Sequence, residues 1–167
     1  MAVAIRKYGY TNIKIYNGGL KDWLKSGNAI TVIDRLPEYE VSFATGEELM
    51  ARVASAEKDG CRTAAGKPLF TLLDLRTELS LDPAGPAVTI RTSCRTVVGL
   101  LDDLLDQSFR DKIPSDSPVY VITETGNRDA FAIKYLSTFG YRNISGLLFG
   151  MRGWIKADYP ITQSNGQ

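Results

Sequence analysis

Hydrophobic residues occur along this chain in short continuous runs, and each run predicts a strand. A long apolar run lies at 69–75, and shorter ones lie at 41–43, 87–90, 119–122 and 144–148. Continuous rather than alternating hydrophobicity is typical of strands buried on both faces, as in parallel sheets. We therefore predict strands in these five segments.

Between these runs, two segments carry apolar residues at the spacing of one helix face. These residues are Val97, Leu101, Leu104, Leu105 and Phe109 in the first segment, and Ala132, Tyr135, Leu136 and Phe139 in the second. Each stripe predicts a helix that packs on a sheet. A further helix over about 46–58 should begin at a capping box formed by Thr45 and Glu48, and a closing helix is expected around 151–156. Strands that alternate with helices predict an α/β domain.

A second pattern is an internal repeat at a separation of 131 residues. Gly9, Tyr10, Asn12 and Ile13 recur as Gly140, Tyr141, Asn143 and Ile144; at the same separation Gly19 matches Gly150, Trp23 matches Trp154, Lys25 matches Lys156, and Ile30-Thr31 matches Ile161-Thr162. The chain has only two tryptophans, and both fall in register. We interpret the repeat as a duplication in which both tryptophans anchor a core.

The repeat also divides the chain. If one copy is about as long as the separation, then 1–33 is the C-terminal end of a preceding repeat. The polar stretch 34–40, which contains a proline, suits a linker. The complete domain then covers 41–162, and 163–167 is a tail. Residues 1–33 would carry an exposed apolar face, which we expect to dock on the complete domain or on a second copy, giving a homodimer.

Composition and charge exclude several classes of function. Twenty basic and nineteen acidic residues give a net charge of +1 without a basic block, so nucleic acid is not expected as a partner. The chain has no histidine, which excludes a Ser-His-Asp triad, a Cys-His pair and most zinc sites. No stretch approaches the ~18 apolar residues of a membrane helix. The sequence predicts a soluble chain and leaves its compartment open.

The two cysteines are too few for a disulfide framework and form no C-x-x-C motif. We interpret Cys61 and Cys94 as structural or incidental thiols. Cys94 lies between Arg91 and Arg95, which makes a lowered thiol pKa conceivable and Cys94 a weaker candidate nucleophile. We expect neither a metal nor a cofactor.

Chemistry is expected in the loop that follows the strand at 119–122, because ligands of open parallel sheets collect at the carboxyl ends of the strands. This loop reads Thr123, Glu124, Thr125, Gly126, Asn127, Arg128 and leads into a helix that begins near residue 128. Backbone N–H groups at such a turn point inward and form an anion-binding nest.

At these positions the chain resembles the rhodanese (sulfurtransferase) family. Asp74-Leu75-Arg76 resembles the family's D-[VL]-R, and Thr123 to Arg128 resembles its loop C-x-[ST]-G-x-R. The segments 140–144 and 150–154 resemble the closing G-Y-x-N-V and G-G-x-x-x-W. The resemblance implies an open, mainly parallel five-stranded sheet with helices on both faces, and a tandem-domain member. Asp74 and Arg76 would brace the active-site side of the sheet.

The resemblance also implies a missing activity. Active members carry sulfur as a persulfide on the first loop residue, a cysteine, and here that residue is Thr123. An alcohol forms no persulfide, so we expect a non-catalytic scaffold or interaction module. Glu124 and Asp129 would further disfavour a bound anion, and Arg128 is expected to pair with one of them.

Two alternatives remain open. The preceding repeat, the expected partner in cis, could supply the catalytic cysteine of an active sulfurtransferase. A tyrosine-phosphatase-like enzyme of the same fold is less favoured, because its loop C-x-x-x-x-x-R is longer than the segment from Thr123 to Arg128 and begins with a cysteine.

Overall fold

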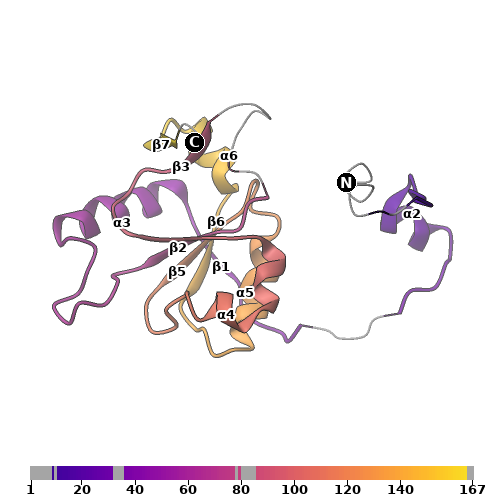
Figure 1. Ribbon diagram of the computed structural model, residues 1–167, viewed down its shortest axis with the longest axis horizontal. Helices are drawn as coiled ribbons and strands as arrows, with labels where there is room; N and C mark the ends of the chain where they lie inside the picture. The colour runs from indigo at the N-terminus through magenta and orange to yellow at the C-terminus, as the bar shows by residue number, and fades with distance from the viewer. Residues whose placement is uncertain (1–8, 10, 32–35, 78, 80–85, 165–167) are drawn as a thin grey trace. The chain divides into compact units, whose positions relative to one another are not determined.

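The computed structural model describes residues 9, 11–31, 36–77, 79 and 86–164 (Figure 1). The chain divides into two units, residues 1–35 and 36–167. The described part of the first unit contains one helix, α2 (Gly19–Lys25), none of whose residues is buried. Trp23 is 39% exposed, so the prediction that it anchors a core was wrong for this tryptophan. The reason is that α2 has no apolar layer beneath it within the described part of its unit.

The second unit is built on five parallel strands, as the sequence predicted. They are β1 (Ser42–Ala44), β2 (Thr71–Asp74), β4 (Arg95–Val98), β5 (Val119–Ile122) and β6 (Ile144–Leu147), in the spatial order β1-β6-β5-β2-β4. All four residues of β2 are buried, because this strand has neighbours on both sides and is covered on both faces. The predicted α/β class is confirmed.

Helices cover both faces of this sheet (Figure 1). One face packs against α3 (Gly46–Lys58) and α6 (Gly150–Lys156), and the other against η1 (Leu101–Leu105), α4 (Gln107–Arg110) and α5 (Asp129–Ser137). Trp154 in α6 is 2% exposed, as predicted for a core anchor. Each face therefore has its own apolar cluster.

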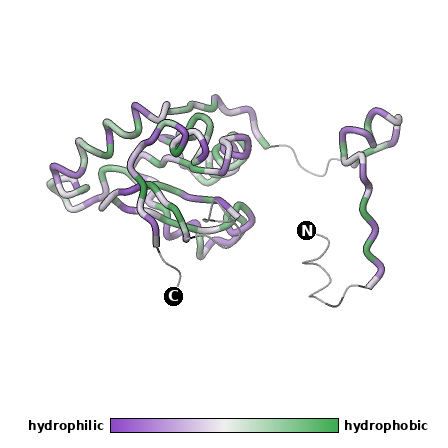
Figure 2. Tube along the Cα trace, turned by 90° about the horizontal axis from the view of Figure 1, so that it is seen from above, coloured by the Kyte–Doolittle hydropathy of each residue, from purple (hydrophilic) through white to green (hydrophobic). Residues whose placement is uncertain are grey.

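The start of α3 follows from its local sequence. The Thr45 side-chain oxygen accepts from the Glu48 backbone N–H at 3.1 Å, and the Glu48 carboxylate accepts from the Thr45 backbone N–H at 2.7 Å. These reciprocal bonds form the predicted capping box. Figure 2 shows hydrophobic and hydrophilic residues alternating along this helix, whose buried side chains are Leu49, Val53 and Ala56.

The fifth strand of the sheet is not the predicted one. The segment 87–90 forms β3 (Ala87–Ile90), which pairs antiparallel with β7 (Ile161–Ser164) in a separate two-stranded sheet. The edge position of the main sheet belongs to β4 instead. Only Val97 of β4 is buried, so this strand lacks the apolar run that identifies central strands.

The helix predicted over 97–109 was also wrong in extent. This segment contains the end of β4, the short η1 and the four-residue α4. Val97, Leu104 and Phe109 are buried on one sheet face, whereas Leu105 is exposed. Apolar residues that share one side of a layer can therefore mimic helical spacing without forming one helix. The helix predicted from Ala132, Tyr135, Leu136 and Phe139 is α5, but Phe139 does not belong to its buried face. The helix ends at Ser137, and Phe139 is exposed.

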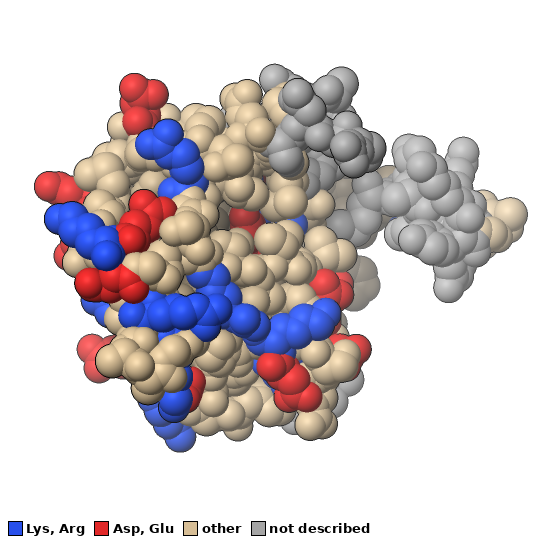
Figure 3. All heavy atoms as spheres, turned by 60° about the vertical axis from the view of Figure 1, so that its left-hand side comes forward, with Lys and Arg blue, Asp and Glu red and all other residues tan. Residues whose placement is uncertain are grey.

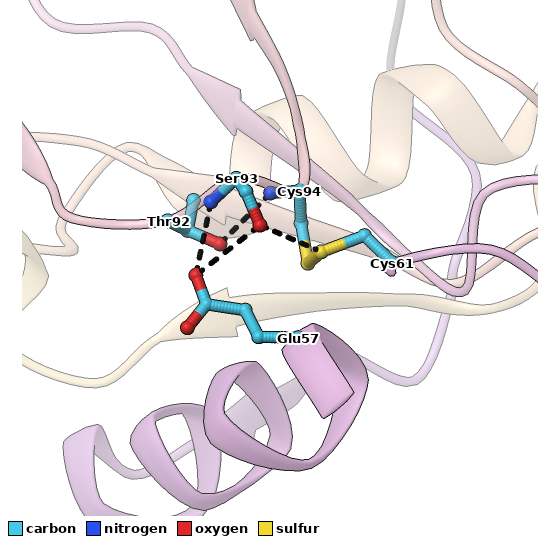
Figure 4. The surroundings of a disulfide bond; sticks show 5 residues. All are labelled: Glu57, Cys61, Thr92, Ser93 and Cys94. Atoms are coloured by element: carbon cyan, nitrogen blue, oxygen red, sulfur yellow. Dashed lines mark hydrogen bonds between the residues drawn. A yellow bond between two sulfur atoms is a disulfide. The ribbon is translucent and has the colours of Figure 1, made fainter. Parts of the chain in front are cut away.

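The two cysteines form a disulfide, which corrects their interpretation as thiols (Figure 4). Cys61 and Cys94 are 33 residues apart in sequence, with Cα atoms 5.0 Å apart. Both cysteines are held next to the start of β2. The backbone N–H of Leu69, two residues before β2, donates to the Cys61 carbonyl, and Arg95, the residue after Cys94, pairs with Thr71 of β2. Strand register therefore brings the cysteines together. It also removes Cys94 as a candidate nucleophile in the oxidised chain.

Among the residues that the structure describes, no helix has the length and hydrophobicity needed to cross a membrane. On the face drawn in Figure 3, Lys and Arg side chains form a band, and Asp and Glu side chains lie on both sides of it. This face therefore carries charges of both signs.

Candidate functional site

The candidate site lies where two neighbouring strands, β2 and β5, end at the same edge of the sheet. The loop after β5 and the residues after β2 line one cleft of about 330 Å³. Its lining consists of Leu75, Arg76, Thr77, Thr123, Glu124, Thr125, Asn127 and Arg128. The structure therefore brings Arg76 together with five of the six predicted loop residues, whereas Gly126 and Asp74 do not line the cleft.

Thr123 occupies the first position of this loop, and its side chain is directed into the protein. The residue is 3% exposed. Its hydroxyl donates to Asp129 Oδ1 at 2.6 Å and accepts from the Gly126 backbone N–H at 3.2 Å. One N–H group of the predicted nest is thus bonded to the loop's own side chain. Gly126 has φ +81° and packs against the backbone of Leu147, Phe149 and Gly150, so a side chain there would be both strained and crowded.

Asp129 is fully buried at the start of α5, directly behind the loop. Its Oδ2 accepts from the Leu147 backbone N–H at 3.0 Å, while Oδ1 is bonded to Thr123. Burial raises the pKa of Asp129 to about 7, although both hydrogen bonds favour the charged form. This carboxyl therefore faces the interior and contacts the side chain at position 123, whereas the sequence had suggested a position at the open side of the nest.

The other loop carboxylate also points away from the expected partner. Glu124 Oε1 accepts from Arg152 Nε of α6 at 2.8 Å. Arg128 is exposed and forms an ion pair with neither Glu124 nor Asp129 in the described part of the chain, so the predicted internal pairing was wrong. Glu124 instead joins the loop to α6, and Arg128 leaves a cation at the cleft.

Asp74 and Arg76 form a buried ion pair beside the cleft. Arg76 Nε and Nη2 donate to the two Asp74 oxygens at 2.9 and 2.7 Å, and Nη2 also donates to the Val88 carbonyl at 2.6 Å. Arg76 Nη1 is buried without a hydrogen-bond partner among the described residues. The two-point pairing holds the chain that leaves β2 in one conformation and places Arg76 in the wall of the cleft.

Two residues around this site had not been identified from sequence as contributors. Arg152 holds Glu124, and Phe149 lies between β6 and α6 and is 68% exposed. Asp129 had been identified from sequence as a repelling charge, but not as the group that holds Thr123. The backbone of α6 also binds the loop, since Met151 and Arg152 donate to the Thr123 and Glu124 carbonyls at 2.9 and 3.0 Å. The only sequence signal was at Phe149, which stands where the closing G-G motif has its first glycine.

In the part of the chain that the structure describes, no group of three or more Cys, Asp or Glu side chains could hold a metal ion. The groups available for chemistry at the cleft are hydroxyls, one carboxylate, one amide and two guanidinium groups. Such a set can bind an anion but offers no sulfur.

Solved structures with this arrangement of strands and helices include rhodanese-like domains. The solution structure of a rhodanese-like domain from Anabaena sp. matches with a TM-score of 0.51 and 20% identity, over 74% of this chain and 80% of that one. A full-length protein from Lactobacillus plantarum matches with a TM-score of 0.54 and 14% identity, over 73% of this chain and 88% of that one. No family model matches the sequence, and no curated protein does.

The class of protein that these observations define is an α/β protein with a rhodanese-like fold. The resemblance noted in the sequence is thereby confirmed for the fold. At this level of identity the likeness concerns the fold alone.

Proposed function

We propose that residues 41–162 form a rhodanese-like domain that does not transfer sulfur and acts as a scaffold or interaction module. The observation that carries the proposal is Thr123 at the first position of the loop. Its hydroxyl is buried and bonded on both sides, to Asp129 and to the Gly126 backbone. Sulfur transfer of the rhodanese kind needs a thiolate at this position, and an alcohol supplies none.

The rest of the site supports the same proposal. Both cysteines of the chain are bonded to each other, so neither can replace the missing nucleophile. Asp129 would also hinder a thiolate at position 123, because a buried carboxyl 2.6 Å away disfavours a second negative charge.

A thiosulfate:cyanide sulfur-transfer assay tests this proposal. The wild-type chain should give no turnover above a buffer control, and turnover would contradict the proposal. Thr123→Cys alone should stay weak because of Asp129. The double variant Thr123→Cys/Asp129→Ser should gain a persulfide, detected as an added 32 Da by intact mass, about the mass of one sulfur atom. Asp129→Ser alone is the matched control and should gain nothing.

A second candidate function rests on the internal repeat. We infer that 1–33 is the end of a preceding rhodanese-like repeat, with 34–40 as linker and 163–167 as tail, and that the preceding repeat is the partner of residues 41–162 in cis. Support comes from the local geometry of the two copies. Trp23 Nε1 donates to the Ala29 carbonyl and Trp154 Nε1 to the Pro160 carbonyl, each at 3.0 Å.

In this second candidate the catalytic cysteine belongs to the preceding repeat, and residues 41–162 support an active sulfurtransferase. Sequencing the native gene upstream of the Met1 codon discriminates the two. A C-x-x-G-x-R motif there favours the enzyme, and a repeat without it favours the scaffold. Sedimentation of the present chain tests the homodimer, which requires a concentration-dependent mass.

A further inference from the structure

Phe149 has a backbone conformation that its side chain disfavours. Its φ is +65°, in the left-handed region that glycine adopts most readily. Among the described residues, only Cys61 and Asp158 are other non-glycine residues with positive φ. Cys61 is fixed by its disulfide, and aspartate tolerates this region comparatively well. The strain at Phe149 lacks such an explanation.

The fold imposes this conformation on residue 149 whatever its side chain. Leu148 donates to the Ala44 carbonyl of β1 at 2.9 Å, and Met151 donates to the Thr123 carbonyl at 2.9 Å. The turn between these bonds also lies against Gly126 of the candidate loop. A glycine would satisfy this turn without strain. Phe149 is nevertheless 68% exposed, so core packing does not account for it.

The Phe149 side chain lines a groove of about 620 Å³ that begins next to the candidate site. The other lining residues are Thr125, Arg152, Gly153, Lys156 and Ala157. Thr125 also lines the cleft of the candidate site, so the two hollows share one wall. A groove of this size and largely apolar character accommodates a large side chain together with its neighbours.

The charge beside the groove selects the kind of occupant. Arg152 and Lys156 are four residues apart on α6 and therefore lie on the same side of the helix. Glu124 neutralises Arg152, whereas Lys156 has no carboxylate partner in the described part of the chain. The apolar groove is therefore bordered by a cation that is free to meet a carboxylate.

We propose that this groove binds an acidic peptide segment of a partner protein, with an aromatic or aliphatic side chain inserted beside Phe149 and a carboxylate at Lys156. The proposal rests on the proposed function, since it names the surface by which a non-catalytic domain would act. Strained residues cluster at functional sites, and Phe149 is both strained and exposed beside the candidate site.

The test pans a phage-displayed library of random dodecapeptides against the whole chain. Enriched peptides should combine acidic residues with a large apolar residue, and a synthetic peptide from the enriched set is then titrated by fluorescence anisotropy. Phe149→Gly should weaken its binding at least tenfold and at the same time raise the thermal midpoint of the chain, because the strain is removed. Lys156→Glu should weaken binding severalfold and shift enrichment toward basic peptides.

The matched control is Phe131→Ala, which removes another exposed aromatic side chain from α5, on the opposite face of the sheet; it should change binding less than twofold. The proposal is overturned if no peptide is enriched, or if Phe149→Gly leaves binding unchanged. Concentration-dependent dimerisation that Phe149→Gly abolishes would also overturn it, because the occupant would then be a second copy. Sulfur transfer by the wild-type chain would instead refute the proposed function, whatever the panning yields.

Discussion

The helices α2 and α6 lie 131 residues apart and have nearly the same local backbone in very different surroundings. Gly19 and Gly150, the first residues of the two helices, have φ +60° and +58°. After each helix the chain turns through a left-handed residue, at Gly27 with φ +74° and at Asp158 with φ +57°. Yet α6 is packed into a core, while α2 has no buried residue.

This comparison separates what local sequence determines from what the domain adds. The helix, its end and the tryptophan hydrogen bond six residues ahead form with or without burial. Burial of the tryptophan requires the sheet and α3. The two turns differ at one position: Gly18 has φ −76° and Phe149 has φ +65°. The candidate loop packs against the turn at Phe149, which accounts for the left-handed conformation there.

The largest expected effect comes from truncating the two tryptophans. Trp154→Ala removes a buried side chain and should lower the free energy of unfolding by about 3–5 kcal/mol. Trp23→Ala removes a partly exposed side chain and should change it by less than about 0.5 kcal/mol. Urea denaturation followed by circular dichroism measures both, and equal losses would contradict the comparison.

The disulfide stabilises the same core cluster that α6 covers. It closes a loop between residues 33 apart. Replacing Cys61 and Cys94 together by alanine should therefore lower the free energy of unfolding by about 3–4 kcal/mol. Denaturation of the oxidised wild type, the reduced wild type and the double variant measures this effect. Reduction and double replacement should give similar losses, and an unchanged midpoint after reduction would refute the expectation.

The two helix-initial glycines offer a test of the contact between α6 and the loop. A Cβ at Gly150 would collide with the Thr123 carbonyl and the Gly126 backbone nitrogen, whereas a Cβ at Gly19 would meet no atom within 4 Å. Gly150→Ala should cost about 3 kcal/mol, the sum of strain and crowding, and Gly19→Ala about 1 kcal/mol from strain alone. Thermal unfolding of the two variants measures both losses of stability. A loss for Gly19→Ala as large as that for Gly150→Ala would count against the contact between α6 and the loop.

A smaller effect should appear as a dependence of stability on pH, confined to the unit formed by residues 36–167. The pKa of Asp129 is about 7 in the folded chain, above the unfolded value near 3.9. The native state therefore holds a proton that the unfolded state loses between these values. Stability from this group is complete below about pH 4 and falls as pH rises through 7.

Between pH 5 and pH 7 we expect a fall of about 2 kcal/mol. Asp129→Asn keeps the shape and an acceptor for the Leu147 N–H, and it should remove this fall. Urea midpoints at several pH values measure the slope. A wild-type slope that persists in the variant would assign the titration to another group.

Much of the fold could be predicted from sequence because it depends on local or strongly apolar patterns. The capping box at Thr45 and the buried run of β2 are of this kind. The edge strand β4 was missed because three of its four residues are exposed. A single buried valine gives no hydrophobic pattern from which a strand can be predicted. The disulfide was missed because strand register, rather than cysteine spacing, brings Cys61 and Cys94 together.

The position of the candidate site could be predicted from the sequence, but the hydrogen-bond and ion-pair partners of its side chains could not. The loop Thr123 to Arg128 could be located from its motif and from the strand before it. The partners of its side chains could not, because Glu124 binds Arg152, 28 residues away on another helix, and only the fold brings them together. Asp129 lies on the next element, and its inward direction follows from the packing of α5 on β6.

The bonded cysteines have a practical consequence for chemistry on the native chain. Iodoacetamide and maleimide dyes react with free thiols, and this polypeptide in its oxidised form holds none. Labelling should therefore fail on the untreated protein and reach two sites only after unfolding in the presence of a reductant, so the number of alkyl groups taken up reports directly on the redox state of a preparation.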